Sequence, residues 1–272
     1  MALFRRNLTD KDLDFIIETV APEVTDKLRL KQILIEDAQF RAEFLSDERI
    51  FNRVIGEKEV FLKISPALFF EILLRKALKD LKKQGYTWEK EAHMNIPIFD
   101  VSEVVGFLDN EEHIAYLADM LSSFTRVENY TVYLKIGKGI WRKVRFNDMD
   151  IQSLMSFCEM VDEDRRLGLY KRIADICLFI LGLFPDWAER NYRYPVSGEV
   201  RPAIFGQSRI SPEEYEKEGK KFYKLAATHK YVRDTVWEEI FWDLHENFQK
   251  AKKPLNFIAD NYLRYTRQNI FM

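Results

Sequence analysis

Apolar residues recur every three to four positions along most of this chain, which is the spacing of amphipathic α-helices. A clear start signal is Ser65 followed by Pro66, because the serine hydroxyl caps a first helical turn and the proline has no N–H to leave unpaired. The helical stretch that follows, "ALFFEILLRKALKDLKKQ", runs to Gly85, a residue type common just after a helix. Similar start signals occur at Thr9, Asp100, Asn110, Asp148 and Ser211.

Two further long segments are predicted to be helices. Residues 165–184, "RRLGLYKRIADICLFILGLF", become apolar on nearly every side in their second half and stop before Pro185, which is typical of a helix inside a bundle. Residues 232–250, "VRDTVWEEIFWDLHENFQK", are predicted to end before Pro254, because proline breaks a helix interior. We expect an all-α protein, mainly a helical bundle of about nine to eleven helices.

Residues 130–146, "YTVYLKIGKGIWRKVRF", break the helical pattern. Their side chains alternate as in a strand with one apolar face, and Gly-Lys-Gly is a connection typical of hairpins, so we predict one inserted β-hairpin here. We favour a hairpin that covers one end of the bundle, with basic residues that prevent strand aggregation. The alternative is a nucleic-acid binder that contacts phosphates through the basic residues of this hairpin. These are Lys135, Lys138, Arg142, Lys143 and Arg145.

The length and charge of the chain limit its organisation. At 272 residues it is near the size at which one core stops growing, and we expect a single helical domain over residues 1–272, with an alternative boundary near residues 127–148. The 42 basic and 44 acidic residues nearly balance, which argues against a surface devoted to nucleic acid. The longest apolar run, residues 176–184, is far shorter than the ~20 residues of a membrane span, and no signal-peptide pattern occurs. We expect a cytoplasmic protein.

Motifs with specific chemistry are missing from the sequence. None of the four histidines lies three or four positions from another, and no Glu-x-x-His ligand pair occurs. No nucleophile elbow or dinucleotide fingerprint is found either. The sequence therefore predicts no metal site and no cofactor, and it disfavours an enzyme.

Three acidic residues lie in apolar segments that are predicted to be helical, where charged side chains are rare unless they are paired: Glu71, Asp119 and Asp175. Arg75 follows Glu71 by four positions, and Lys171 precedes Asp175 by four. The plain interpretation is ion pairs along half-exposed helices. The alternative is that these helices converge and the three carboxylates line a polar ligand site.

A second irregular segment, residues 194–210, contains two prolines and two glycines. Long loops without secondary structure are uncommon in compact domains and are often lids. In the alternative of a ligand site, this loop covers the pocket, with Arg201 and Arg209 as ligand-binding residues together with Glu71 and Arg75.

The sequence does not establish a function. The leading hypothesis is a non-catalytic cytoplasmic binding protein, such as an adaptor, regulator or assembly partner, because chemical motifs are missing and aromatic residues are abundant. Its expected partner is a protein. An enzyme or small-molecule binder with the helical pocket and a nucleic-acid binder are the alternatives, nucleic acid being the less favoured partner.

Overall fold

The computed structural model describes residues 8–57, 59–91, 94–126, 129–137, 140–147, 149–195, 197–202 and 209–271. Over these residues the chain is mainly helical, with fifteen α-helical segments, one short 3-10 helix and two antiparallel hairpins of two strands each. The predicted all-α class with an inserted hairpin is confirmed. The helical segments outnumber the expectation because capping residues such as Asp37 and Asp47 divide long helical stretches into short pieces.

Contacts along the chain define two compact units. Unit 1 comprises Met1–Thr125 and Lys253–Arg267, and unit 2 comprises Arg126–Lys252 and Gln268–Met272. The chain passes from unit 2 back to unit 1 within one helix, α14 (Phe248–Asn261). Each unit has its own buried apolar residues, and the single-domain expectation stays a prediction.

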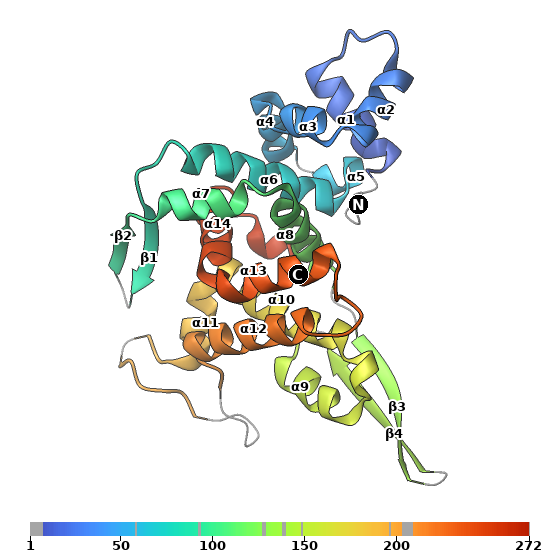
Figure 1. Cartoon of the computed structure of the whole chain (residues 1–272). Helices are drawn as coiled ribbons and strands as arrows, with labels where there is room; N and C mark the ends of the chain where they lie inside the picture. The colour runs from blue at the N-terminus through green and yellow to red at the C-terminus, as the bar shows by residue number, and fades with distance from the viewer. Residues whose placement is uncertain are drawn as a thin grey trace. The chain divides into compact units, whose positions relative to one another are not determined.

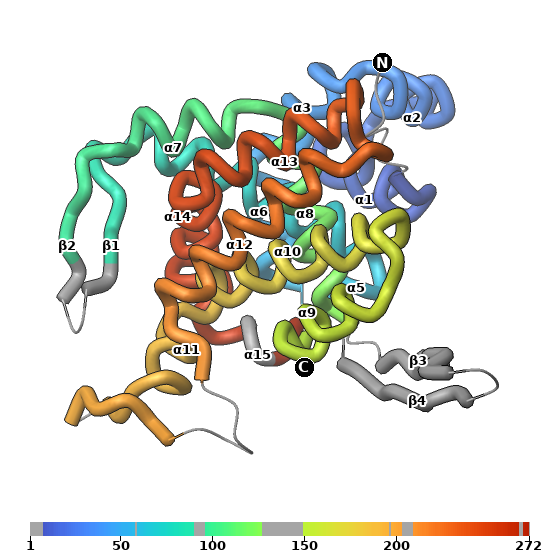
Figure 2. Tube along the Cα trace, turned by 60° about the horizontal axis from the view of Figure 1, so that its bottom comes forward, coloured from blue at the N-terminus to red at the C-terminus, as the bar shows by residue number. Residues whose placement is uncertain are grey.

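Unit 1 is a set of helices followed by a hairpin and two further helices (Figure 1). In both views the hairpin strands β1 and β2 lie side by side between the ends of α6 and α7 (Figure 2). The elements are α1 (Asp10–Val20), α2 (Lys27–Glu36), α3 (Ala38–Leu45), α4 (Glu48–Gly56), α5 (Val60–Lys63), α6 (Pro66–Leu81), β1 (Thr87–Glu91), β2 (Met94–Ile98), α7 (Val101–Leu108) and α8 (Glu111–Ser123), together with α14 from Lys253 on.

Helix starts in unit 1 follow the predicted capping chemistry. The Ser65 hydroxyl accepts the N–H of Leu68 at the start of α6, at 3.1 Å. At the start of α1, the Thr9 hydroxyl accepts the N–H of Asp12 while one Asp12 oxygen accepts the N–H of Thr9, at 2.9 Å. The other Asp12 oxygen accepts the N–H of Ser65 at 2.7 Å. The fully buried Asp12 carboxylate therefore joins the N-termini of α1 and α6.

Unit 2 is built around α10, which is buried along its second half, as its apolar sequence predicted. The elements are β3 (Asn129–Gly137), β4 (Ile140–Asn147), α9 (Ile151–Met160), the 3-10 helix η1 (Glu163–Arg165), α10 (Leu167–Leu183), α11 (Pro185–Tyr192), α12 (Pro212–Ala227) and α13 (Val236–Glu246), with the first turn of α14 and, at the C-terminus, most of α15 (Arg267–Ile270).

The backbones of α10 and α12 approach closely because Gly219 of α12 has no side chain. A Cβ atom built at Gly219 would lie 2.5 Å from a ring carbon of Phe248 and 2.9 Å from the Cβ of Cys177. Both neighbours are fully buried. Only glycine fits this helix crossing without movement of its neighbours.

One local prediction is wrong, and another is correct in position but not in its capping bond. The helix predicted to run as far as Pro254 is divided at Asn247, and Pro254 lies inside the next helix, α14. Burial of Ala251, Leu255 and Ile258 at helical spacing outweighs the helix-breaking cost of proline, which is about 3 kcal/mol. The helix start predicted at Asp100 is confirmed, since α7 begins at Val101, but the Asp100 side chain makes no capping bond because its carboxylate bonds to Thr87 and Lys253.

The start predicted at Asp148 falls on a residue outside the described ones. The helix α9 begins after Asp150, whose carboxylate accepts the N–H of Ser153 at 3.3 Å. The predicted hairpin is present as β3 and β4, and a second hairpin, β1 and β2, was not expected.

Candidate functional site

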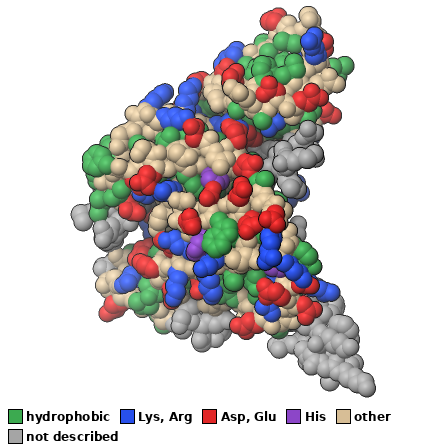
Figure 3. All heavy atoms as spheres, viewed as in Figure 1, with side chains coloured by type: hydrophobic (Ala, Val, Ile, Leu, Met, Phe, Trp, Pro, Cys, Tyr) green, Lys and Arg blue, Asp and Glu red, His purple; other side chains and the backbone are tan. Residues whose placement is uncertain are grey.

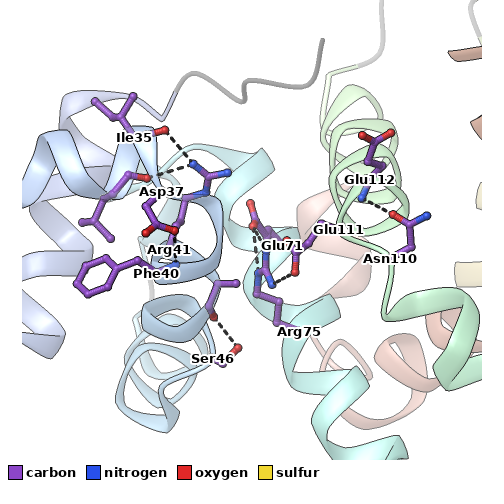
Figure 4. Close-up of polar contacts among 12 residues, drawn as sticks. Ile35, Asp37, Phe40, Arg41, Ser46, Glu71, Arg75, Asn110, Glu111 and Glu112 are labelled. Atoms are coloured by element: carbon purple, nitrogen blue, oxygen red, sulfur yellow. Dashed lines mark hydrogen bonds and ion pairs between the residues drawn. The ribbon is translucent and has the colours of Figure 1, made fainter. Parts of the chain in front are cut away.

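Glu71 and Arg75 form a buried ion pair inside unit 1 (Figure 4). The Arg75 guanidinium donates to Glu71 Oε1 from Nη2 at 2.8 Å and from Nε at 3.1 Å. It also donates to both oxygens of Glu111 in the first turn of α8, at 2.9 and 2.5 Å. Burial alone would lower the pKa of Arg75, but the two carboxylates outweigh it and the pKa is raised. The guanidinium thus holds α6 to α8.

The three acids of the pocket hypothesis have different surroundings. Glu71 is buried beside Arg75, whereas Asp119 is exposed on α8. Asp175 belongs to unit 2. Whether these carboxylates line one site stays a prediction.

Asp175 is a buried carboxylate with partners on two helices of unit 2. Its Oδ2 accepts from Lys171 Nζ at 2.5 Å within α10, and its Oδ1 accepts from the hydroxyl of Tyr223 on α12 at 2.9 Å. Tyr223 is fully buried, whereas the Lys171 side chain is 32% exposed. The contacts are those of a structural bond between α10 and α12.

We expect Asp175→Ala to lower the free energy of unfolding by about 2 kcal/mol, because the buried Tyr223 hydroxyl loses its carboxylate acceptor. Lys171 contributes less, since water reaches it. Denaturant unfolding of Asp175→Ala, Tyr223→Phe and the double variant provides the measurement. If the Tyr223 hydroxyl accounts for the lost stability, Asp175→Ala lowers the free energy of unfolding clearly less in the Tyr223→Phe variant than in the unchanged protein. Equal losses in both backgrounds would contradict this explanation.

The two loop arginines bond to their own surroundings. Arg201 donates from Nε to the Arg193 carbonyl at 3.3 Å, and its guanidinium lies 4.5 Å from the centre of the Tyr194 ring. Arg209 donates from Nη1 to the carbonyl and side-chain oxygens of Asn191, at 3.0 and 2.6 Å. Residues 196 and 203–208 lie outside the described residues, so the lid stays a prediction.

The basic hairpin is described by its backbone. The strands β3 and β4 pair antiparallel, with Val132 opposite Val144 and an irregularity between Lys135 and Gly137. Of the basic residues, Lys138 lies outside the described residues, and nothing about the side chains of the others is described. The nucleic-acid interpretation stays a prediction.

Nucleophilic chemistry at the cysteines is disfavoured. Burial raises the pKa of Cys158 to about 11, and it raises the pKa of Cys177 further. Both groups are therefore thiols at neutral pH, and the thiolate is the nucleophile. Within the described part of the chain, no group of three or more potential metal ligands is found. No described helix combines the length and apolarity needed to cross a bilayer.

The clearest exposed feature of unit 1 is a group of aromatic side chains at the root of the β1–β2 hairpin, which we call the aromatic cluster: Tyr86, Trp88 and Phe99. The Tyr86 ring contacts Trp88 and Phe99 edge to face, with ring centres 4.9 and 6.4 Å away. The three side chains are 37%, 51% and 82% exposed. Hydrophobic side chains gather in this region of the space-filling view (Figure 3).

The strand register explains why these rings share one face. Thr87 pairs with Ile98 and Trp88 with Pro97, so Tyr86 and Phe99 occupy the next opposing positions. Side chains alternate along a strand, which places Tyr86, Trp88, Pro97 and Phe99 on one side. Pro97 is exposed as well. The hairpin turns these rings outward, whereas Ile96 and Ile98 lie on the other side with the buried Thr87.

The opposite side of the hairpin root is tied to unit 1. The buried Thr87 hydroxyl donates to Asp100 Oδ1 at 2.5 Å, and Lys253 bonds to Asp100 Oδ2. Burial would raise the pKa of Asp100, but the bonds from Lys253 and Thr87 outweigh it and the pKa is lowered. This anchor fixes which side of the hairpin faces outward.

Sequence reasoning missed the aromatic cluster. The available signal was the alternation of side chains in two short segments. The first, "YTW" at residues 86–88, follows Gly85, and the second, "IPIF" at residues 96–99, precedes a predicted helix. The charged residues between them and Pro97 hide the strands, because such residues are depleted in sheets.

Comparisons with family models, with curated proteins and with solved structures give no match to this chain.

Proposed function

We propose that the protein acts by binding a partner protein through the aromatic cluster, as an adaptor, regulator or assembly partner. The single observation that carries the proposal is the outward position of Tyr86, Trp88 and Phe99 on a hairpin whose other side is anchored. Exposed groups of large apolar side chains mark interaction sites, and tyrosine and tryptophan are enriched among the residues that dominate binding energy.

The anchor supports this role because it holds the rings in place before binding. Side chains that are already ordered lose less conformational freedom on association. The edge-to-face contacts of Tyr86 with both neighbours restrict the rings further. A binding role needs neither a metal nor a reactive side chain, which agrees with the chemistry of the buried thiols.

A cytoplasmic location is part of the same proposal. Cys158 and Cys177 are both free and buried in unit 2, and free thiols are typical of proteins in reducing compartments.

The test compares three forms of the full chain as bait in extracts of the cells that produce it. We expect the double variant Trp88→Ser with Phe99→Ser to lose partner proteins that the unchanged chain retains, as counted by quantitative mass spectrometry. The matched control is Trp187→Ser in α11, because Trp187 is also 51% exposed. The melting temperatures are expected to stay close together, since exposed rings contribute little to stability. Identical sets of proteins on all three baits would refute the proposal.

A further inference from the structure

We infer that His229 makes the turn between α12 and α13 sensitive to pH, so that this turn opens in mildly acidic solution. The turn comprises residues 228–235 and lies wholly in unit 2. The inference goes beyond the proposed binding function, because it concerns a device in the other unit that does not involve the aromatic cluster. Histidine is the side chain whose charge ordinarily changes between about pH 5 and pH 8.

The first step is the hydrogen bonding of the His229 ring, which is 4% exposed. Nε2 lies 3.0 Å from the carbonyl oxygen of Glu163 in η1, and a carbonyl can only accept, so Nε2 carries a proton. Nδ1 lies 3.3 Å from the backbone nitrogen of Tyr231, whose N–H can only donate, so Nδ1 carries none. The closed turn therefore requires a neutral imidazole with its proton on Nε2.

The second step is the effect of a second proton on this ring. That proton would lie on Nδ1 and point at the N–H of Tyr231, which replaces a hydrogen bond with a contact between two donors. The bond from Nε2 to the Glu163 carbonyl would persist. Opening of the turn relieves the contact, because water can then accept from Nδ1. Proton uptake therefore accompanies opening, and linkage makes opening more favourable as the pH falls.

The third step is the set of charged groups around His229. The two carboxylates of η1 already bond to cations: Glu163 accepts from Arg166 at 2.9 Å, and Asp164 pairs with Lys230 of the turn. The other charged residues of the turn, Arg233 and Asp234, are exposed. The remaining groups against the imidazole are the aromatic rings of Tyr170 and Tyr231, with ring centres 6.5 and 5.2 Å away. Charge near the ring is thus balanced, and the bond to the Tyr231 N–H decides the response.

His245 in α13 provides a contrast within the same unit. Its Nδ1 lies 2.8 Å from the carbonyl oxygen of Lys220, so this nitrogen already carries a proton. A second proton would occupy Nε2 and leave that bond intact. Of these two histidines, only His229 uses a ring nitrogen as an acceptor for a backbone N–H.

The experiment measures hydrogen–deuterium exchange of the Tyr231 amide by NMR in the purified full chain, at about pH 7.5 and about pH 5.5. Each rate is divided by the rate of an unstructured chain at the same pH, which removes the direct effect of pH on exchange. We expect the protection of this amide to fall at least about fivefold at the lower pH, as for the loss of one hydrogen bond.

His229→Asn is the matched variant, because an asparagine side-chain oxygen accepts from the N–H two residues further on and does not titrate. Its Tyr231 amide is expected to be equally protected at both pH values. His245→Asn is the control and is expected to keep the fall of the unchanged protein.

A second measurement needs no substitution. NMR of the ring nitrogens of His229 is expected to place its single proton on Nε2 at the higher pH, and to detect a second proton on Nδ1 at the lower pH together with the loss of Tyr231 protection. A proton on Nδ1 at the higher pH overturns the inference, as does a protonated ring with undiminished protection. A fall in protection that persists in His229→Asn also overturns it, because another group would then control the turn.

Discussion

Arg75→Ala is expected to lower the free energy of unfolding by about 3–5 kcal/mol, the typical loss when one partner of a buried ion pair is removed. The reason is that Glu71 stays buried without the guanidinium that donates two hydrogen bonds to it. Glu111→Ala provides the matched control, because the Glu111 side chain is half exposed and water replaces its partner. Its removal is expected to cost about 1 kcal/mol or less.

Replacement of the pair by apolar residues separates charge from packing. In the double variant Glu71→Leu with Arg75→Met, neither charge remains and the volume is nearly kept, so stability is expected to return close to that of the unchanged protein. Equilibrium unfolding in urea measures all the variants. A double variant as unstable as Arg75→Ala would show that the charges themselves are required.

Gly219→Ala is expected to destabilise the protein by about 3 kcal/mol, although alanine favours helices over glycine. The added methyl group would overlap the Phe248 ring and the Cys177 side chain, and both are buried with no room to retreat. Gly168→Ala in α10 is the control, because nothing lies within 4 Å of a Cβ there. It is expected to be neutral or slightly stabilising.

The source of the Gly219 effect is testable with a compensating change. Phe248→Leu removes the ring carbons nearest to the added methyl group, so the cost of Gly219→Ala is expected to be smaller in that background. Thermal unfolding followed by circular dichroism is sufficient for the comparison. An unchanged cost would mean that contact with Cys177, or a shift of α12, dominates.

Local features of the fold were predictable because short-range chemistry determines them. Ser65 with Pro66, Thr9 with Asp12 and Ser211 with Glu214 all form the caps that the sequence predicts. Each depends on residues within three positions of one another. The buried second half of α10 was equally clear from its continuous apolar sequence.

Features that depend on distant partners were not predictable in this way. Asp100 has the sequence pattern of a helix cap, but Lys253, far along the chain, takes its carboxylate. Pro254 has the pattern of a helix end, but burial keeps it inside α14. The aromatic cluster depends on the pairing register of β1 and β2. A shift of one residue in the pairing of a strand would move its side chains to the other face. The pairing of Glu71 with Arg75 was predictable from their spacing, whereas its burial and the contribution of Glu111 from α8 were not.

The buried Asp12 carboxylate has a consequence for local opening of the N-terminal helix. The N–H of Ser65 is bonded to a side chain from a helix more than fifty positions earlier in the chain. Its proton can exchange with solvent deuterium only when that carboxylate withdraws, so the exchange rate at Ser65 measures detachment of α1 from α6. Amides inside α6 exchange through a different event, the opening of that helix itself. A Ser65 amide that exchanges faster than its neighbours in α6 would identify α1 as a separately opening segment of unit 1.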